Sequence, residues 1–167
     1  QPGSVLTKSG GYFQVFSQFR KVCYSRLHTA LPALVKAPGA QLPLSINADP
    51  LPQRVEGFPS PTQALRELWP AGEDEAQRRL EQFSDEQIHY YQSERDFPAK
   101  PGTSQLSPYL AAGVISPRQC LHAALRGNQG EFESGSPGAV TWINELLWRE
   151  FYNCLLYTSD AADEEDS

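Results

Sequence analysis

A run of prolines in the first half of the chain places the strongest limit on its fold. Six of them fall within residues 36–61, at Pro38, Pro43, Pro50, Pro52, Pro59 and Pro61. Because proline fixes φ and has no backbone N–H, such a stretch continues neither a helix nor the middle of a sheet. It is also longer than the usual connection inside a compact domain. We therefore predict an extended connector at 36–61 that runs between two domains.

Helical patterns lie on both sides of this connector. The spacing of apolar residues predicts helices over 12–35, 62–69 and 73–92, with a restart at Ser84 left open. Two Ser-Pro pairs, at 116–117 and 136–137, join an N-cap residue to the proline favoured at the first helical position, and each predicts another helix. No run after residue 60 has the period-two alternation of a strand. The visible chain is predicted to be mostly α-helical.

Three of the predicted helices have a distinct apolar face. In 12–35 this face comprises Phe16, Phe19, Val22, Cys23 and Leu27. In 73–92 it comprises Ala76, Leu80 and Phe83, and in 137–152 it comprises Ile143, Leu146, Leu147 and Phe151. Cys23 and Cys120 fall within apolar patterns, so we expect small buried side chains there. Three cysteines without short-range pairing indicate a reducing compartment.

Composition limits the class of protein. With 167 residues, 40% hydrophobic and 20% charged, the chain can build one sizeable core. No window approaches the roughly 18–20 apolar residues of a membrane span, so we expect a cytoplasmic protein with no membrane partner. The net charge of −6 includes five acids in the last 14 residues; without them 15 acids face 14 Lys and Arg. A nucleic-acid partner is therefore not excluded.

Residues 102–107, "GTSQLS", lie between a turn and a predicted helix. Backbone N–H groups there, with the hydroxyls of Thr103, Ser104 and Ser107, suit a phosphate or pyrophosphate. Helix capping is the commoner reason for Ser and Thr in such a place, and both interpretations stay open. The three histidines show no metal-ligand spacing, so no metal site is predicted.

The helix 137–152 carries a second stripe, made of Glu145, Trp148, Arg149 and Tyr152. Its one Glu–Arg pair at i,i+4 stabilises a helix by only about 0.2–0.5 kcal/mol, which does not explain the aromatics. Aromatic rings beside an arginine can stack on a base or hold a nucleic-acid backbone. Packing against another helix explains the stripe equally well.

Two long segments resemble the DNA photolyase/cryptochrome family, in the family's order and spacing. They are "YYQSERDFPAKPGTSQLSPYLAAGVISPRQCLHAAL" and "WINELLWREFY", and the bacterial class I cyclobutane pyrimidine dimer enzymes are the nearest group. The earlier "GGYFQVFSQF" resembles the segment that leaves the family's N-terminal α/β domain. The resemblance implies that 1–35 ends that domain and that 62–153 begins a helical FAD-binding domain. It also implies a monomeric parent with a folate or other antenna pigment bound outside this chain.

The resemblance assigns roles residue by residue. The implied FAD contacts are Tyr91, Thr103, Ser104, Gln105, Leu106, Ser107 and Trp142. The implied DNA surface comprises Arg95, Glu145, Leu146, Leu147, Trp148, Arg149, Glu150, Phe151 and Tyr152. Within it Glu145 would hydrogen-bond a flipped dimer and Trp148 would stack on it. Gln105 stands where close bacterial relatives often carry Arg, which removes a cation near the phosphates.

What the resemblance implies is light-driven repair of pyrimidine dimers. A lesion inside a duplex must leave the stack, and photolyases are among the base flippers. The pocket then needs an aromatic wall and a polar group. The set of catalytic groups is incomplete in this chain, so we expect it to be inactive alone. Two alternatives remain: a cryptochrome-type photoreceptor with the same FAD fold, and a helical DNA-binding module without flavin.

The last residues, 154–167, break the pattern. "CLLYTSDAADE" looks like a translated sequencing adapter, so we expect no native element there. A natural disordered acidic tail is the alternative.

Overall fold

A computed structural model gives the fold of residues 3–36, 38–40, 49–50, 52 and 54–165, with the backbone alone described over 157–165. The α-helices are α1 (Phe16–Thr29), α2 (Gln63–Leu68), α3 (Glu73–Gln82), α4 (Tyr91–Glu94), α5 (Ser107–Ala111), α6 (Pro117–Gly127) and α7 (Pro137–Glu165). A π-helical turn, η1 (Phe83–Gln87), and a 3-10 turn, η2 (Ile88–Tyr90), join α3 to α4. No strand occurs among the described residues, which confirms the predicted mostly α-helical class.

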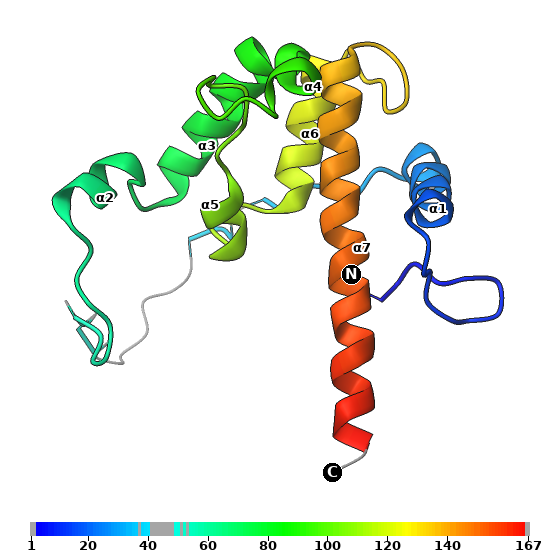
Figure 1. Cartoon of the computed structure of the whole chain (residues 1–167), viewed down its shortest axis with the longest axis horizontal. Coiled ribbons are helices and arrows are strands. Elements are labelled where there is room, and N and C mark those ends of the chain that lie inside the picture. Colours follow the sequence, from blue (N-terminus) through cyan, green and yellow to red (C-terminus); the bar gives the residue numbers. More distant parts are fainter. Residues whose placement is uncertain (1–2, 37, 41–48, 51, 53, 166–167) are drawn as a thin grey trace.

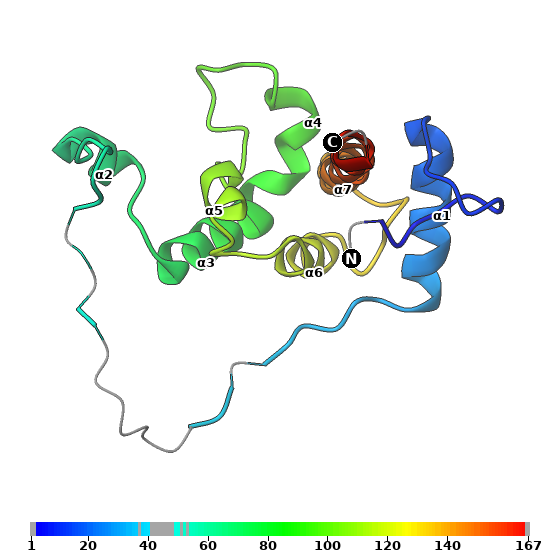
Figure 2. The same cartoon turned by 90° about the horizontal axis from the view of Figure 1, so that it is seen from below.

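Helix α7 lies at the centre of four packed elements. It contacts α1 on one side and α4, η2 and α6 on the other, as the end-on view in Figure 2 makes clear (Figure 1 gives the side view). Its predicted apolar face is buried throughout, at Ile143, Leu146, Leu147 and Phe151. Burying such a side chain contributes about 1.5–3 kcal/mol. That exceeds any surface ion pair on the helix, so the apolar face sets how α7 is rotated.

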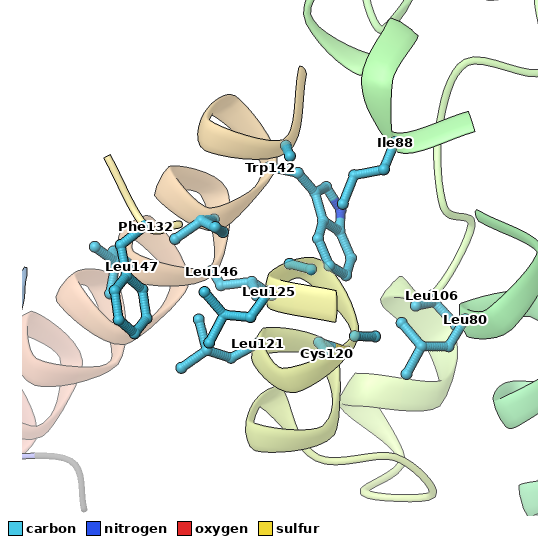
Figure 3. Packing of buried hydrophobic residues seen from close by; sticks show 14 of the residues in the cluster. Leu80, Ile88, Leu106, Cys120, Leu121, Leu125, Phe132, Trp142, Leu146 and Leu147 are labelled. Atoms are coloured by element: carbon cyan, nitrogen blue, oxygen red, sulfur yellow. The ribbon is translucent and has the colours of Figure 1, made fainter. Parts of the chain in front are cut away.

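The core beside the site lies between α6 and α7. Leu121 and Leu125 of α6 meet α7, and the indole of Trp142 points between Ile88 and α6 (Figure 3). Cys120 is fully buried in this layer, as predicted, and burial raises the pKa of its thiol to about 12. It behaves here as a small apolar side chain.

Two glycines let η1 and η2 lie close against the neighbouring helices. A Cβ at Gly138, in the first turn of α7, would collide with the carbonyl oxygens of Ile88 and His89. A Cβ at Gly127 would lie 2.7 Å from the carbonyl oxygen of Ser84. Side chains at these positions would push the segment away. The close approach therefore fixes where α4 begins.

The predicted helix over 73–92 is wrong in its continuity, because α3 ends at Gln82. The Ile88 N–H bonds to the Phe83 carbonyl, an i→i+5 contact that widens the turn. This wider turn places Phe83 and Ile88 on one face, and both are fully buried. No new helix starts at Ser84, which lies inside the π-helical turn and whose hydroxyl donates to the Glu81 carbonyl.

The predicted helix over 12–35 is also too long, because α1 covers only Phe16–Thr29. Ala30 is extended, at φ −153° and ψ 107°, and Pro32 prevents the helix from resuming. On its apolar face Phe19 and Cys23 are buried, and the sequence interpretation missed Tyr24. The Tyr24 hydroxyl donates to Asn144 Oδ1 at 2.9 Å and so ties α1 to α7.

The predicted starts of the last two long helices are confirmed. Ser116 and Gln119 form a reciprocal capping box before α6: the Ser116 hydroxyl accepts from the Gln119 N–H, and the Gln119 side chain accepts from the Ser116 N–H. Helix α7 begins at Pro137, after Ser136.

The connector prediction lies partly outside the described residues, at 37, 41–48, 51 and 53. Its described residues, with the flanking 30–35 and 62, form neither helix nor strand. The division into domains stays a prediction.

Beyond Asn153 the described backbone is helical, and that residues 154–167 are not native stays a prediction. Helix α7 continues to Glu165, and Cys154 is buried with 6% of its surface exposed. Residues 154–165 contain no Gly or Pro to break the helix, and half of them are Leu, Ala or Glu. The acidic end opposes the helix dipole, which weakens only the last turn.

Candidate cofactor and DNA site

A groove of about 560 Å³ lies between α4, the 103–107 loop, α5 and α7. This volume is within the usual range for ligand sites, about 300–1,000 Å³. It is lined by Tyr91, Thr103, Ser104, Gln105, Ser107, Leu110, Ala111, Trp142, Glu145, Leu146 and Arg149. Six of the seven predicted FAD contacts and three predicted DNA contacts thus share one groove. The seventh predicted FAD residue, Leu106, belongs to the loop, but its side chain is buried.

The aromatic part of the lining is supported from behind by Phe83. The Tyr91 ring meets Phe83 edge-on, with centroids 5.9 Å apart, and Trp142 lies 4.9 Å from it. Burial raises the pKa of Tyr91, with a further contribution from the Glu145 carboxylate. Phe83 was predicted only as core. Its role behind both rings depends on the π-helical turn, which apolar spacing does not reveal.

The 103–107 loop presents hydroxyls that the protein does not use. Leu106, not a Ser or Thr, is the N-cap of α5, and no side chain caps that helix. Within the described part of the chain, the hydroxyls of Thr103, Ser104 and Ser107 have no hydrogen-bond partner. Capping therefore does not explain them. Gly102 sets the loop against α4, because a Cβ there would collide with Glu94.

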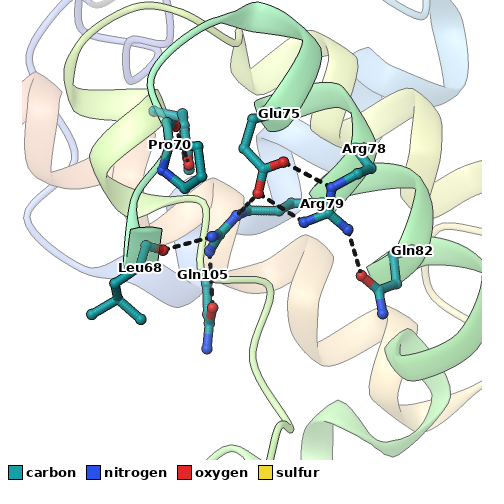
Figure 4. A network of polar contacts seen from close by, with 8 residues as sticks. Leu68, Pro70, Glu75, Arg78, Arg79, Gln82 and Gln105 are labelled. Carbon is teal, nitrogen blue, oxygen red and sulfur yellow. Dashed lines mark hydrogen bonds and ion pairs between the residues drawn. The ribbon is translucent and has the colours of Figure 1, made fainter. Parts of the chain in front are cut away.

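A polar network supports the loop from α3 (Figure 4). Arg79 donates to the Gln105 side chain at 2.9 Å and to the Leu68 carbonyl at 2.7 Å, and it pairs with Glu75 at 2.7 Å. Hydrogen bonds from Arg78 and Arg79 lower the pKa of Glu75 to about 2. The sequence interpretation missed this network. Glu75 and Arg79 have the i,i+4 spacing of an ion pair, but nothing in the sequence joins them to Gln105.

Charged side chains stand at the α7 side of the groove. Arg95 and Glu145 form an ion pair, and each remains about one-third exposed. The Arg95 guanidinium also lies 5.9 Å from the centre of the Tyr91 ring. Arg149 donates to the Leu110 carbonyl at 3.4 Å, a long contact that links α7 to α5. These polar contacts are few and partly open to solvent.

Trp148 is placed differently from the expectation for a lesion-stacking wall. Its indole stacks on Phe16 of α1, with centroids 3.6 Å apart and planes 10° apart, and Tyr152 stacks 5.5 Å away. Trp148 does not line the groove. Of the two interpretations left open for this stripe, helix packing describes Trp148 in this structure.

The rest of the predicted DNA run divides in the same way. Leu147 and Phe151 are 7% and 4% exposed and lie in the core, not on the surface expected to meet DNA. Tyr152 is exposed, and Glu150 lies 3.9 Å from Arg149. For Leu147 and Phe151, the helical spacing of apolar residues predicted burial correctly, whereas the family resemblance had assigned both residues to the DNA surface.

Comparison with known proteins identifies the family. No protein-family model matches the chain. The deoxyribodipyrimidine photo-lyase of Escherichia coli (strain K12) is 39% identical over 155 residues, which cover 93% of this chain and 32% of that protein. The protein of the same name from Salmonella typhimurium is 38% identical over 156 residues, with the same coverage. The one from Neurospora crassa is 34% identical over 172 residues, covering 93% and 27%. The chain belongs to the photolyase family.

The chain spans about a third of the length of these two bacterial relatives. Within the described residues, no three His, Cys, Asp or Glu side chains gather as a metal site requires. Over the same residues, no helix is long and apolar enough to cross a membrane.

Proposed function

We propose that the chain is part of a light-driven DNA repair enzyme and that its groove receives FAD at one end and a flipped pyrimidine dimer at the other. The observation that carries the proposal is the shared groove. Residues assigned separately to cofactor and to DNA meet there, although they come from α4, the 103–107 loop and α7.

The lining fits the chemistry of FAD. A dinucleotide needs flat apolar contacts for its rings and donors for its phosphates. Tyr91 and Trp142 supply the first, and the hydroxyls of Thr103, Ser104 and Ser107, which have no partner among the described residues, supply the second. When bound, reduced and excited by light, the flavin supplies the electron that splits the dimer.

The chain's own groups would receive and orient the lesion. A dimer weakens pairing and stacking, so extruding it costs less than extruding an intact base. The Glu145 carboxylate, held by Arg95, would accept hydrogen bonds from the N–H groups of the extruded bases. Arg149, on the next turn of α7, would hold a backbone phosphate.

A graft tests the proposal. Residues 1–153 replace the matching segment of the E. coli photolyase, and flavin content and light-dependent repair of a thymine-dimer oligonucleotide are measured. We expect bound flavin and repair that requires light. A folded graft without flavin would refute the cofactor assignment. Flavin binding without repair would favour a photoreceptor.

A further inference from the structure

Gln105 lies in an unusual backbone conformation at the centre of the loop. Its φ of 51° is in the left-handed region, which side chains other than glycine seldom adopt without support. The residue itself is exposed, so packing does not hold it there. The contact that does reach it is the hydrogen bond from Arg79 Nη1 to its side-chain oxygen, at 2.9 Å.

Arg79 is itself firmly held. Its side chain is only 13% exposed, and all three guanidinium nitrogens are engaged: Nε with Glu75, Nη2 with the Leu68 carbonyl and Nη1 with Gln105 (Figure 4). The guanidinium also lies 5.0 Å from the ring centre of Trp69 and 5.6 Å from that of Tyr109. A planar cation with this many contacts is a rigid support.

The charge around this support is positive on the side of the loop. A second pocket of about 230 Å³ borders the groove, and it shares Thr103, Ser104 and Gln105 with it. Arg78 and Arg79 also line this pocket, and no acidic residue does. The loop sequence "GTSQLS" contains no cation of its own. Together with their shared partner Glu75, these two arginines leave one net positive charge beside the loop.

We propose that Arg79 is the positioning residue of the loop: through Gln105 it fixes residues 103–107 in the form that receives the phosphates of FAD, and it supplies the cation that the loop lacks. The phosphate part rests on the proposed function. The fixing of the loop does not, because it concerns the chain without ligand.

The first experiment therefore uses the full 167-residue chain without ligand. Amide ¹⁵N relaxation measured by NMR compares the backbone mobility of the wild type with that of Arg79→Gln and with that of Arg78→Gln as the matched control. Arg78 lines the same pocket and pairs with Glu75 but does not contact Gln105. We expect mobility at residues 103–107 to rise in Arg79→Gln, with order parameters falling from about 0.85 to about 0.6, because the side-chain hydrogen bond to Gln105 is lost, and to change little in Arg78→Gln. Equal rises in both variants, or a rise over the whole chain, would overturn the positioning role.

The second experiment measures FAD affinity in the graft, by flavin fluorescence during titration. Arg79→Gln should weaken binding about tenfold, and Gln105→Ala, which leaves the other contacts of Arg79 intact, should weaken it similarly. The exchanged pair Arg79→Gln with Gln105→Arg keeps both a hydrogen bond and a cation, so it should restore most of the affinity. Failure of that rescue in a protein with an unchanged melting temperature would overturn the inference. A wild-type graft that binds no FAD would instead refute the proposed function and the phosphate part with it.

Discussion

On the side that faces α1, helix α7 packs Trp148 and Phe151 against aromatic rings, whereas on the groove side Glu145 and Arg149 make only polar contacts. An aromatic pair contributes about 0.5–1.5 kcal/mol beyond the area it buries. A partly exposed ion pair contributes about 0.2–1 kcal/mol. One helix thus has a firmly packed side and a side whose partners can be exchanged. The comparison shows that neighbouring residues of one helical stripe can differ in how firmly the rest of the protein holds them.

The largest effect is expected on the α1 side. Phe151→Ala should reduce the free energy of unfolding by about 3–5 kcal/mol, because it opens a cavity beside Phe16 and Phe19. Urea unfolding of the chain, followed by circular dichroism, measures it. Tyr152→Ala, at an exposed neighbour, is the control and should cost about 1 kcal/mol or less. Equal costs would remove the distinction between packed and open positions.

The groove side has its own sensitive point at Gly138. Gly138→Ala should cost about 1–3 kcal/mol, because the added methyl meets the carbonyls of Ile88 and His89. It should also lower flavin retention in the graft, since η2 leads directly into Tyr91. Gly39→Ala, where a Cβ meets nothing within 4 Å, is the control. Normal flavin content in a destabilised Gly138→Ala protein would show that the close approach serves only the fold.

Replacing Thr103 and Ser104 together by Ala should separate ligand binding from stability. Two hydroxyl donors are lost from the groove, so FAD retention in the graft should fall at least about tenfold. The unfolding midpoint of the ligand-free chain should stay nearly constant, because these hydroxyls have no partner among the described residues. A loss of stability without a loss of flavin would reverse the assignment.

Acid should weaken the Arg79 network over a defined range. The pKa of Glu75 is lowered to about 2 by Arg78 and Arg79, so its contribution to stability is complete above its ordinary pKa of 4.5. That contribution is lost as the pH falls through about 2. The stability difference between wild type and Glu75→Gln should therefore shrink between these pH values. A difference that stays constant down to pH 2 would contradict the ion pairs.

The smallest effect on the fold is expected for Arg149→Ala. Its long hydrogen bond to Leu110 should be worth about 0.5 kcal/mol or less. In the graft the Arg149→Ala variant should weaken binding of damaged and undamaged duplexes alike, and it should reduce the salt dependence of binding by about one charge.

Trp148→Ala serves as the comparison from the α1 side, and it should lower the free energy of unfolding by about 3 kcal/mol, since its stack on Phe16 is lost. If Trp148→Ala abolishes lesion preference without loss of stability, the indole leaves that stack to meet the base.

The sequence predicted those parts of the fold that depend on local spacing. The apolar face of α7 and the capping box at Ser116 follow from residues three or four apart. Local spacing could not predict that Trp148 meets Phe16 or that Arg79 meets Gln105, because those contacts join distant segments. The resemblance to the family gathered most of the groove residues. It did not separate Leu147 and Phe151, which are buried, from the exposed members of the same run.

The ion pair between Arg95 and Glu145 offers a cation and a carboxylate side by side next to the groove. A ligand that only donates hydrogen bonds to the Glu145 carboxylate leaves the Arg95 guanidinium without its partner. A ligand that only places a negative charge beside Arg95 leaves the Glu145 carboxylate without its partner. A ligand that presents both hydrogen-bond donors and an anionic group would replace both partners of the pair at once.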